Sequence, residues 1–232
     1  MDSNVMQIKP IARIRTDFSE KFGIPRQSGI VAELSARIVF EPEYRDPEAL
    51  RGIEGFDHLW LIWGFSANRN NDWRATVRPP RLGGNVRMGV FATRSPYRPN
   101  PLGLSCVKFV GVEQTESEGS VIIVSGADML DNTPIYDIKP YIPYADSHPD
   151  AKGGFAANKP AESLRVEIPD ELLSKLPEQK RGSLVSVLAQ DPRPAYQNDP
   201  ERIYGLCFAG FDLHFKVNGD VLTVLDLSHG SK

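Results

Sequence analysis

Three loops of the sequence combine proline, arginine, an amide or carboxylate and a nearby aromatic residue. They are KFGIPRQSGI (21–30), ATRSPYRPNPLGLS (92–105) and LAQDPRPAYQ (188–197). Proline fixes its own φ and restricts the residue before it, so these loops are stiff. A guanidinium group mounted on a stiff loop binds an anion in a fixed geometry. The alternative is a set of rigid surface turns whose arginines are simply solvated.

The last of these loops predicts the most specific chemistry. It places Asp191, Arg193 and Tyr196 in one short stretch. A carboxylate and a backbone carbonyl that accept the N–H groups of an exocyclic adenine amine draw electron density toward a poorly nucleophilic nitrogen, while an aromatic face holds the base. The alternative is that Asp191 closes a turn after a helix and Tyr196 packs against its surroundings.

The charge of the chain is unevenly distributed. The 232 residues have a formal net charge of −3, with 41% hydrophobic and 25% charged residues, which is typical of a globular protein and speaks against an overall basic nucleic-acid binder. Between Trp73 and Cys106, however, there are six arginines and no aspartate or glutamate. Such a segment predicts a local positive field, unless acidic neighbours balance it in space. The six are Arg74, Arg78, Arg81, Arg87, Arg94 and Arg98.

Several kinds of site are disfavoured by the sequence. The four histidines and two cysteines lack metal-ligand spacing, so no metal site is expected. The chain contains no P-loop, no strand-linked G-x-G-x-x-G and no G-x-S-x-G elbow. No apolar stretch reaches membrane-spanning length and the N-terminus lacks the apolar core of a signal peptide, so a cytoplasmic protein is expected.

Strand-like segments dominate the first 140 residues and predict a mainly β protein. Each is rich in β-branched or aromatic residues and is bounded by turn residues. Because no strand–helix alternation appears, we expect a mostly antiparallel sheet closed into a barrel or sandwich rather than a doubly wound sheet. The expected strands are 7–15, 29–40, 57–65, 86–93, 103–112 and 120–126.

The pattern changes after a polar, glycine-containing stretch at 144–159. Residues 169–176 and 178–190 have helical spacing, and Pro177 separates them. Two further strands, 203–217 and 221–227, are predicted to form a hairpin through Asn218–Gly219. The chain is therefore expected to end in a small α+β unit, and we place the divisions at 1–145, a linker at 146–165, and 166–232.

The motifs around the arginines resemble a known family. GVFATRSPYRPNPLGLS, preceded by TVRPPRLGGNVRMG and followed by GADMLDNTPIYDIKPYIPYAD, is similar to the TsaA-like/TrmO family, and LAQDPRPAY resembles that family's D-P-R-P-x-Y signature. The resemblance covers essentially the whole chain. It implies a TsaA-like β-barrel over 1–145, an S-adenosylmethionine cofactor and a homodimer. It also implies methylation of N6 of threonylcarbamoyladenosine next to the anticodon, chiefly in threonine tRNA.

Roles for individual residues follow from this resemblance. Asp191 or a nearby carbonyl is expected to accept the N6 proton, and Tyr196 to orient the base. Asn100 and Arg193 are expected to fix the threonylcarbamoyl side chain or the cofactor carboxylate. Arginines outside the cofactor site are expected to bind tRNA phosphate or the threonylcarbamoyl carboxylate, and these are Arg74, Arg78, Arg81, Arg87 and Arg98. The expected cofactor contacts are Pro25, Arg26, Gln27, Arg94, Leu104, Leu188, Ala189, Gln190 and Asp191.

Two other functions stay open at this point. One is a tRNA- or nucleotide-binding barrel without catalysis, which would favour exposed aromatics and lysines along a sheet face, whereas the basic residues here are arginines at loops. The other is a hydrolase, which would need a metal cluster or a nucleophile–base pair that the sequence does not provide.

Overall fold

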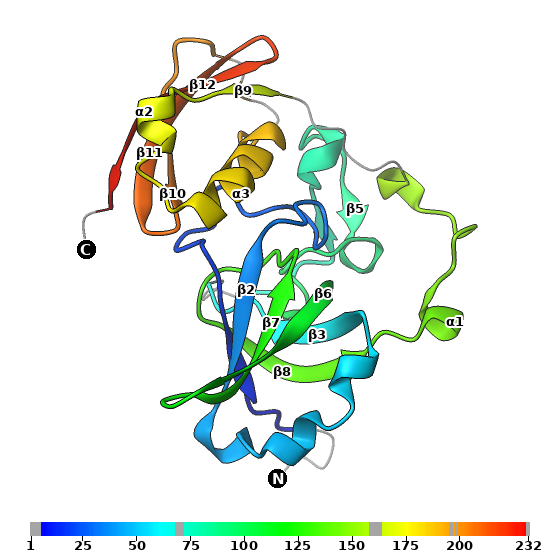
Figure 1. Cartoon of the computed structure of the whole chain (residues 1–232). Helices are drawn as coiled ribbons and strands as arrows, with labels where there is room; N and C mark the ends of the chain where they lie inside the picture. The colour runs from blue at the N-terminus through cyan, green and yellow to red at the C-terminus, as the bar shows by residue number, and fades with distance from the viewer. Residues whose placement is uncertain (1–5, 68–71, 158–163, 195–196, 198, 231–232) are drawn as a thin grey trace.

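The computed structural model describes residues 6–67, 72–157, 164–194, 197 and 199–230. It consists of an N-terminal ring of strands and a smaller C-terminal sheet with helices, which lies above the ring in Figure 1. The mainly β class expected from the sequence is confirmed.

Six strands of the N-terminal part pair in a closed ring. Each pairs antiparallel with two neighbours, in the order β1-β2-β7-β6-β3-β8 and back to β1. Every second residue of a strand points inward, as the pleat requires, and Ile38, Leu59 and Leu61 are fully enclosed. The strands are β1 (Ala12–Arg15), β2 (Ser35–Phe40), β3 (His58–Gly64), β6 (Leu102–Thr115), β7 (Gly119–Ser125) and β8 (Thr133–Pro140).

The expected strands at 57–65, 103–112 and 120–126 correspond to β3, β6 and β7. Those at 7–15 and 29–40 shrink to β1 and β2, because their first halves do not pair in the ring. Strand β8 was not among the strands expected from the sequence, and it contains two prolines, Pro134 and Pro140. Both prolines lie at the ends of the strand, where a missing N–H donor is tolerated.

The strand predicted at 86–93 is wrong. Only β5 (Met88–Gly89) pairs, with β4 (Thr76–Val77), and a 3-10 turn at Val90–Ala92 follows immediately. Strand β5 ends at Gly89 because the chain turns there toward the proline-rich loop. The other 3-10 turns are Pro42–Tyr44, Pro47–Leu50, Ile53–Gly55, Pro80–Leu82 and Gly154–Ala156.

The C-terminal sheet has the order β10-β11-β12-β9, with β9 parallel to β12. The single strand predicted at 203–217 is wrong, because the chain reverses at Ala209 and Gly210. Their φ values of 52° and 80° match the two-residue turns that suit hairpins. The expected hairpin after it is present, with Asn218 opposite Val221. The strands are β9 (Arg165–Glu167), β10 (Tyr204–Phe208), β11 (Phe211–Asn218) and β12 (Val221–His229).

Both helices expected near the C-terminus are present, as α2 (Asp170–Leu173) and α3 (Glu178–Ala189). Helix α3 buries Leu184, Val187 and Leu188, which recur at helical spacing on one side. A short helix, α1 (Pro143–Asp146), precedes residues 147–157, which run along the outside of the molecule (Figure 1).

A segment of the N-terminal part completes the C-terminal core. Between β1 and β2 the chain leaves the ring, and Phe18, Val31 and Leu34 join the apolar cluster formed by α3 and the C-terminal sheet. Lys180 Nζ of α3 lies 2.6 Å from Asp17 Oδ2. Figure 1 shows this segment, in blue, between the ring and α3. The loop that contains residues 25–27 is therefore supported from both sides.

Candidate functional site

The first proline–arginine loop is joined directly to the second. Arg94 Nη1 donates a hydrogen bond to Gln27 Oε1, so the two predicted cofactor residues meet. The loop is anchored where Gly29 N donates to Gly126 O at 2.8 Å. A Cβ on Gly126 would lie 3.1 Å from the Gly29 Cα, and Gly126 has a φ of 77°, so this close crossing of two chains requires glycine.

Asp128 lies close to this junction, in the connection between β7 and β8. Its Oδ1 accepts a hydrogen bond of 2.6 Å from Ser105 Oγ, and Ser105 Oγ in turn accepts one of 3.0 Å from Trp63 Nε1. Burial raises the pKa of Asp128, while hydrogen bonds from Ser105 and from the backbone of Ser28, and the charge of Arg94, act against that rise. One carboxylate therefore connects both predicted cofactor loops.

Sequence reasoning did not find Asp128, Ser105 or Trp63. Asp128 was part of a stretch noticed only for its family resemblance, and Trp63 and Ser105 lie in expected strands. An inward-facing polar residue has no distinct signal when the partner that satisfies it lies far away in the sequence. The separations here are 42 residues between Trp63 and Ser105 and 23 between Ser105 and Asp128.

A cavity of about 210 Å³ opens beside this network. Its walls are mainly apolar or aromatic, with the Asp128 carboxyl and Lys21 as the charged groups. The lining residues are Lys21, Ile24, Trp63, Gly64, Phe65, Ser66, Ala67, Pro96, Asp128, Met129, Leu130 and Thr133. Its rim thus includes the residue before Pro25 and a proline two residues from Arg94.

A second cavity, of about 630 Å³, shares Gly64, Phe65 and Ser66 with the first. Asn100 belongs to this larger cavity, together with Pro101 and Tyr136. The structure therefore places Asn100 next to the space beside Asp128 but in a different cavity. Of the two cavities, the smaller one is lined by Asp128, whose carboxyl group is bonded to Ser105.

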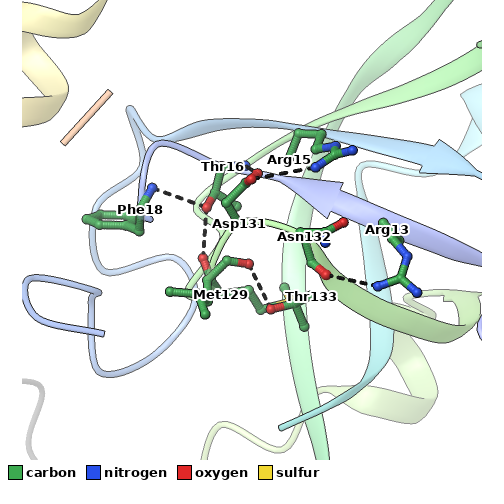
Figure 2. Close-up of polar contacts among 9 residues, drawn as sticks. Arg13, Arg15, Thr16, Phe18, Met129, Asp131, Asn132 and Thr133 are labelled. Atoms are coloured by element: carbon green, nitrogen blue, oxygen red, sulfur yellow. Dashed lines mark hydrogen bonds and ion pairs between the residues drawn. The ribbon is translucent and has the colours of Figure 1, made fainter. Parts of the chain in front are cut away.

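The end of β1 is hydrogen-bonded to the segment that follows Asp128, as Figure 2 shows. Thr16 Oγ1 donates to Met129 O at 3.0 Å, and Thr16 N donates to Asp131 Oδ1 at 3.0 Å. Thr133 Oγ1 donates to Leu130 O at 2.7 Å. These bonds fix the chain on the C-terminal side of Asp128.

The proline-rich segment 93–101 is a loop between the 3-10 turn Val90–Ala92 and β6, which begins at Leu102. Arg98 Nη1 donates to Thr93 O at 2.7 Å, which ties the loop to its own start. Phe65 N donates to Pro101 O at 3.1 Å, which ties its end to the ring. Leu104, in β6, has half of its surface exposed and is open to contact from outside the chain.

The third loop forms a separate cluster. Asp191, with a φ of 51°, accepts two hydrogen bonds from the Arg193 guanidinium, at 2.8 and 2.9 Å. This pairing raises the pKa of Arg193, and burial opposes the rise. The side chain of Leu188 is fully buried in the C-terminal core, so that residue can face a ligand only through its backbone. Tyr196 lies outside the described residues.

In the part of the chain that the structure describes, no hydrogen bond joins residues 188–193 to 25–28 or to Arg94. Among the predicted cofactor residues, Gln27 and Arg94 therefore meet near Asp128, and Pro25 and Arg26 precede Gln27 in the chain. Leu104 lies in β6 next to Ser105, and Leu188, Ala189, Gln190 and Asp191 lie with Arg193. The predicted RNA-binding arginines lie mostly on another part of the chain. Arg74, Arg78, Arg81 and Arg87 are exposed on and around the β4–β5 hairpin, and Arg98 is half-buried.

Two further observations concern the described residues as a whole. They contain no group of three or more His, Cys, Asp or Glu side chains arranged to hold a metal ion. None of their helices has the length and apolarity needed to span a membrane.

Comparison with known proteins relates both parts of the chain to one family. Residues 13–147 match the tRNA-methyltransferase O N-terminal domain, and residues 161–230 match the TrmO C-terminal domain. The chain is 42% identical over 220 residues to the tRNA (adenine(37)-N6)-methyltransferase of Escherichia coli (strain K12), covering 91% of this chain and 93% of that protein. A putative S-adenosylmethionine-dependent methyltransferase of Pseudomonas aeruginosa, RcsF, is 40% identical, covering 96% and 98%.

Solved structures agree with these sequence relatives. The crystal structure of TrmO from Pseudomonas aeruginosa superposes with a TM-score of 0.79 at 32% identity, and it covers 97% of this chain and 98% of that one.

Proposed function

The chain belongs to the TrmO family, and we infer that it is an S-adenosylmethionine-dependent tRNA methyltransferase that modifies N6 of an adenosine. The relatives named for this activity align with this chain over nearly their whole length, so the alignment includes both the N-terminal ring and the C-terminal unit. We propose further that the closed ring is the TsaA-like barrel, that the adenosine lies next to the anticodon of threonine tRNA, and that it already carries the threonylcarbamoyl group.

The observation that carries this proposal is the junction of Arg94, Gln27 and Asp128 beside an apolar cavity. S-adenosylmethionine has a carboxylate, a sulfonium cation and an adenine ring. A guanidinium suits the first and an apolar wall suits the last. The donor set at Pro25–Gln27 and Arg94 therefore fits this group, and the Asp128 carboxylate adds a negative charge nearby.

When bound, S-adenosylmethionine supplies an activated methyl carbon. The protein's own task is to hold the two reactants in line and to exclude water, because positioning alone can provide a large part of the rate enhancement. Arg94 is fixed by Gln27 and by the prolines around it, and Trp63 is fixed by Ser105. The groups that face the cofactor are thus ordered before it binds.

We propose that Asp191 receives the N6 proton, with the base oriented by Tyr196. The bidentate bond to Arg193, with a further bond of 3.2 Å from Arg193 N to Oδ1, fixes the carboxylate in one orientation and leaves a lone pair of Oδ2 available. Asp191 has a positive φ, so its backbone carbonyl does not continue the direction of the carbonyls in helix α3. Asn100 and Arg193 are proposed to contact the threonylcarbamoyl side chain or the cofactor carboxylate.

The remaining parts of the proposal concern the partner and the assembly. The exposed arginines at 74, 78, 81 and 87, with Arg98, are proposed to contact tRNA phosphate or the threonylcarbamoyl carboxylate. We propose a homodimer that works in the cytoplasm. A tRNA-binding module without catalysis is the second candidate, and it predicts RNA binding without cofactor binding.

Nucleoside mass spectrometry tests the reaction directly. Threonine tRNA with and without the threonylcarbamoyl group is incubated with protein and S-adenosylmethionine, then digested. We expect a mass increase of one methyl group on the modified adenosine only. Methylation of both substrates would contradict the proposed requirement for the prior modification. Methylation of neither, with tight tRNA binding, would favour the binding module.

A further inference from the structure

The proline-rich loop and the β4–β5 hairpin bring two arginine–aromatic pairs together. The Arg74 guanidinium lies 5.0 Å from the centre of the Tyr97 ring, and the Arg98 guanidinium lies 5.9 Å from the centre of the Phe91 ring. Arg74 N also donates to Tyr97 O at 3.1 Å. We call Arg74, Phe91, Tyr97 and Arg98 the arginine–aromatic cluster.

This cluster presents aromatic surface to solvent. Phe91 is 74% exposed, and Trp73, next to Arg74 in the chain, is 54% exposed. Single exposed apolar residues are common on proteins, but two large aromatic rings beside several cations are not explained by core packing. Phe91 follows the fully buried Val90, so its outward direction is fixed by the 3-10 turn that contains both residues.

The arginines around Phe91 have no anionic side chain among the residues that the structure describes. Arg74, Arg78, Arg87 and Arg98 form no ion pair there, whereas Arg13, Arg37 and Arg193 each do. The hydrogen bonds of Arg87 and Arg98 go to Thr76 Oγ1 and to loop carbonyls, which leaves their charges uncompensated. The surface therefore favours a polyanion.

We propose that Phe91 and Trp73 form a platform on which unpaired bases of the anticodon loop stack while the neighbouring arginines hold the phosphates. This inference rests on the proposed function, which makes tRNA the substrate, and it adds base contacts that the arginines alone do not provide. Single-stranded nucleic acids bind where a positive surface carries exposed aromatic rings. A duplex offers no free base faces to such rings, so the platform selects loops.

Fluorescence anisotropy with an unmodified anticodon stem–loop of threonine tRNA, without cofactor, tests this proposal. Phe91→Ala is expected to weaken binding about 5- to 30-fold, as the loss of one stacked base does, with an unchanged dependence on salt. Arg87→Ala is expected to reduce the slope of log affinity against log salt by about 0.7 instead. Phe91→Tyr restores affinity, and Phe91→Leu, which is apolar but lacks a ring face, does not.

A fully paired hairpin RNA of the same length and Phe56→Ala are the matched controls. Phe56 is also partly exposed but lies at the end of the 3-10 turn Ile53–Gly55, outside the cluster. The paired RNA is expected to bind wild type and Phe91→Ala equally, and Phe56→Ala is expected to bind the loop like wild type. Because Phe91 is so exposed, its replacement leaves the melting temperature unchanged.

Three outcomes overturn the proposal. Phe91→Ala binds the loop as wild type does, or it loses affinity for loop and paired RNA alike. In the third outcome, sedimentation shows that Phe91→Ala changes the oligomeric state of the protein while RNA affinity stays the same. That result would assign this surface to contact with a second copy of the chain. Binding is measured without methyl transfer, so the outcome is separate from that of the proposed function. Inactive protein with intact stacking contradicts only the proposed function.

Discussion

The residue whose environment most shapes the candidate site is Asp128. It is the shared acceptor for Ser105 and for the backbone of Ser28, and it faces Arg94. Removing one partner of a buried charged hydrogen bond typically costs more than the bond contributes net, because the other partner is left unsatisfied. Through these contacts, Asp128 links the loop that contains Ser28 to the loop that contains Arg94.

The pKa of Asp128 predicts a distinct dependence of stability on pH. Burial raises this pKa above the value of about 3.9 for an unfolded chain. The folded protein therefore holds the Asp128 proton more tightly than the unfolded chain does at pH values between the two pKa values. The contribution is fully present below the unfolded pKa and is lost as pH rises through the folded pKa. Asp128→Asn is expected to remove this decline in urea unfolding free energy, measured from about pH 3.5 to 7.

The control for that measurement is Asp57→Asn, which changes an exposed carboxylate. It is expected to keep the wild-type profile. If Asp128→Asn and wild type show the same pH dependence, Asp128 does not titrate as its surroundings indicate.

Asp191 predicts a loss of turnover with little loss of cofactor affinity. Asparagine tolerates a positive φ and still accepts a hydrogen bond from Arg193, but it cannot take up a proton. Asp191→Asn is expected to lower kcat by about 10²-fold or more. S-adenosylmethionine binding, followed by calorimetry, is expected to stay the same. Near-normal turnover would rule out the acid–base role.

At the scale of elements, β3 and β6 position the indole of Trp63. A Cβ on Gly103 of β6 would lie 2.2 Å from the Trp63 ring, so the indole rests directly on the glycine. This contact lets Trp63 Nε1 reach Ser105 two residues further along the same strand. The glycine is required here for close approach rather than for backbone freedom.

Gly103→Ala is therefore expected to destabilise the protein by about 1–3 kcal/mol, as overpacking of a rigid ring does. It should also weaken S-adenosylmethionine binding, because Trp63 moves away from Ser105. Gly111→Ala in the same strand is the control, since its Cβ would meet nothing within 4 Å. Chemical unfolding and calorimetry measure both effects. Equal stability of the two variants would contradict the packing argument.

The elements predicted best from the sequence are those whose own residues carry a clear pattern of strand or helix. The β-branched and aromatic residues of 57–65 and 120–126 indicated β3 and β7, and the apolar spacing in 178–190 indicated α3. Strand β8 was hidden because its prolines resemble loop signals, although they only mark its ends. The turn at Ala209–Gly210 was hidden because alanine at a positive φ has no local signal, and only the pairing of Phe208 with Phe211 requires it.

The candidate site divides in the same way. Gln27 and Arg94 were predicted from the family resemblance of their loops, and the structure brings them together. Asp128 and Ser105 were not predicted, because their partnership depends on the closure of the ring. The sequence shows which residues are chemically suitable, but only the fold shows which of them share an environment.

At the scale of the whole molecule, the N-terminal part contributes residues to the C-terminal core, and the ring has an apolar core of its own. The linker predicted at 146–165 separates two units, and this division did not predict that the segment after β1 packs against the C-terminal sheet. Phe18 is buried there and contacts Phe208 edge-on, with ring centres 5.6 Å apart. An apolar residue in a sequence does not reveal which unit will bury it.

Phe18→Ala is expected to destabilise both units together, by about 3–5 kcal/mol. Urea unfolding followed by tryptophan fluorescence reports on the N-terminal part, which holds Trp60, Trp63 and Trp73. Circular dichroism at helical wavelengths is weighted toward the C-terminal part, which holds α3. Both midpoints should fall by the same amount, and the milder Phe18→Leu should shift them less. An unchanged fluorescence transition would show that the units unfold independently.

The most direct test of the account is the crystal structure of the protein soaked with S-adenosylmethionine. We expect the carboxylate of the cofactor within hydrogen-bonding distance of Arg94, its body against Pro25–Gln27, and Asp128 still bonded to Ser105. Density for the cofactor confined to the larger cavity around Asn100, or absent from the neighbourhood of Arg94, would contradict the account.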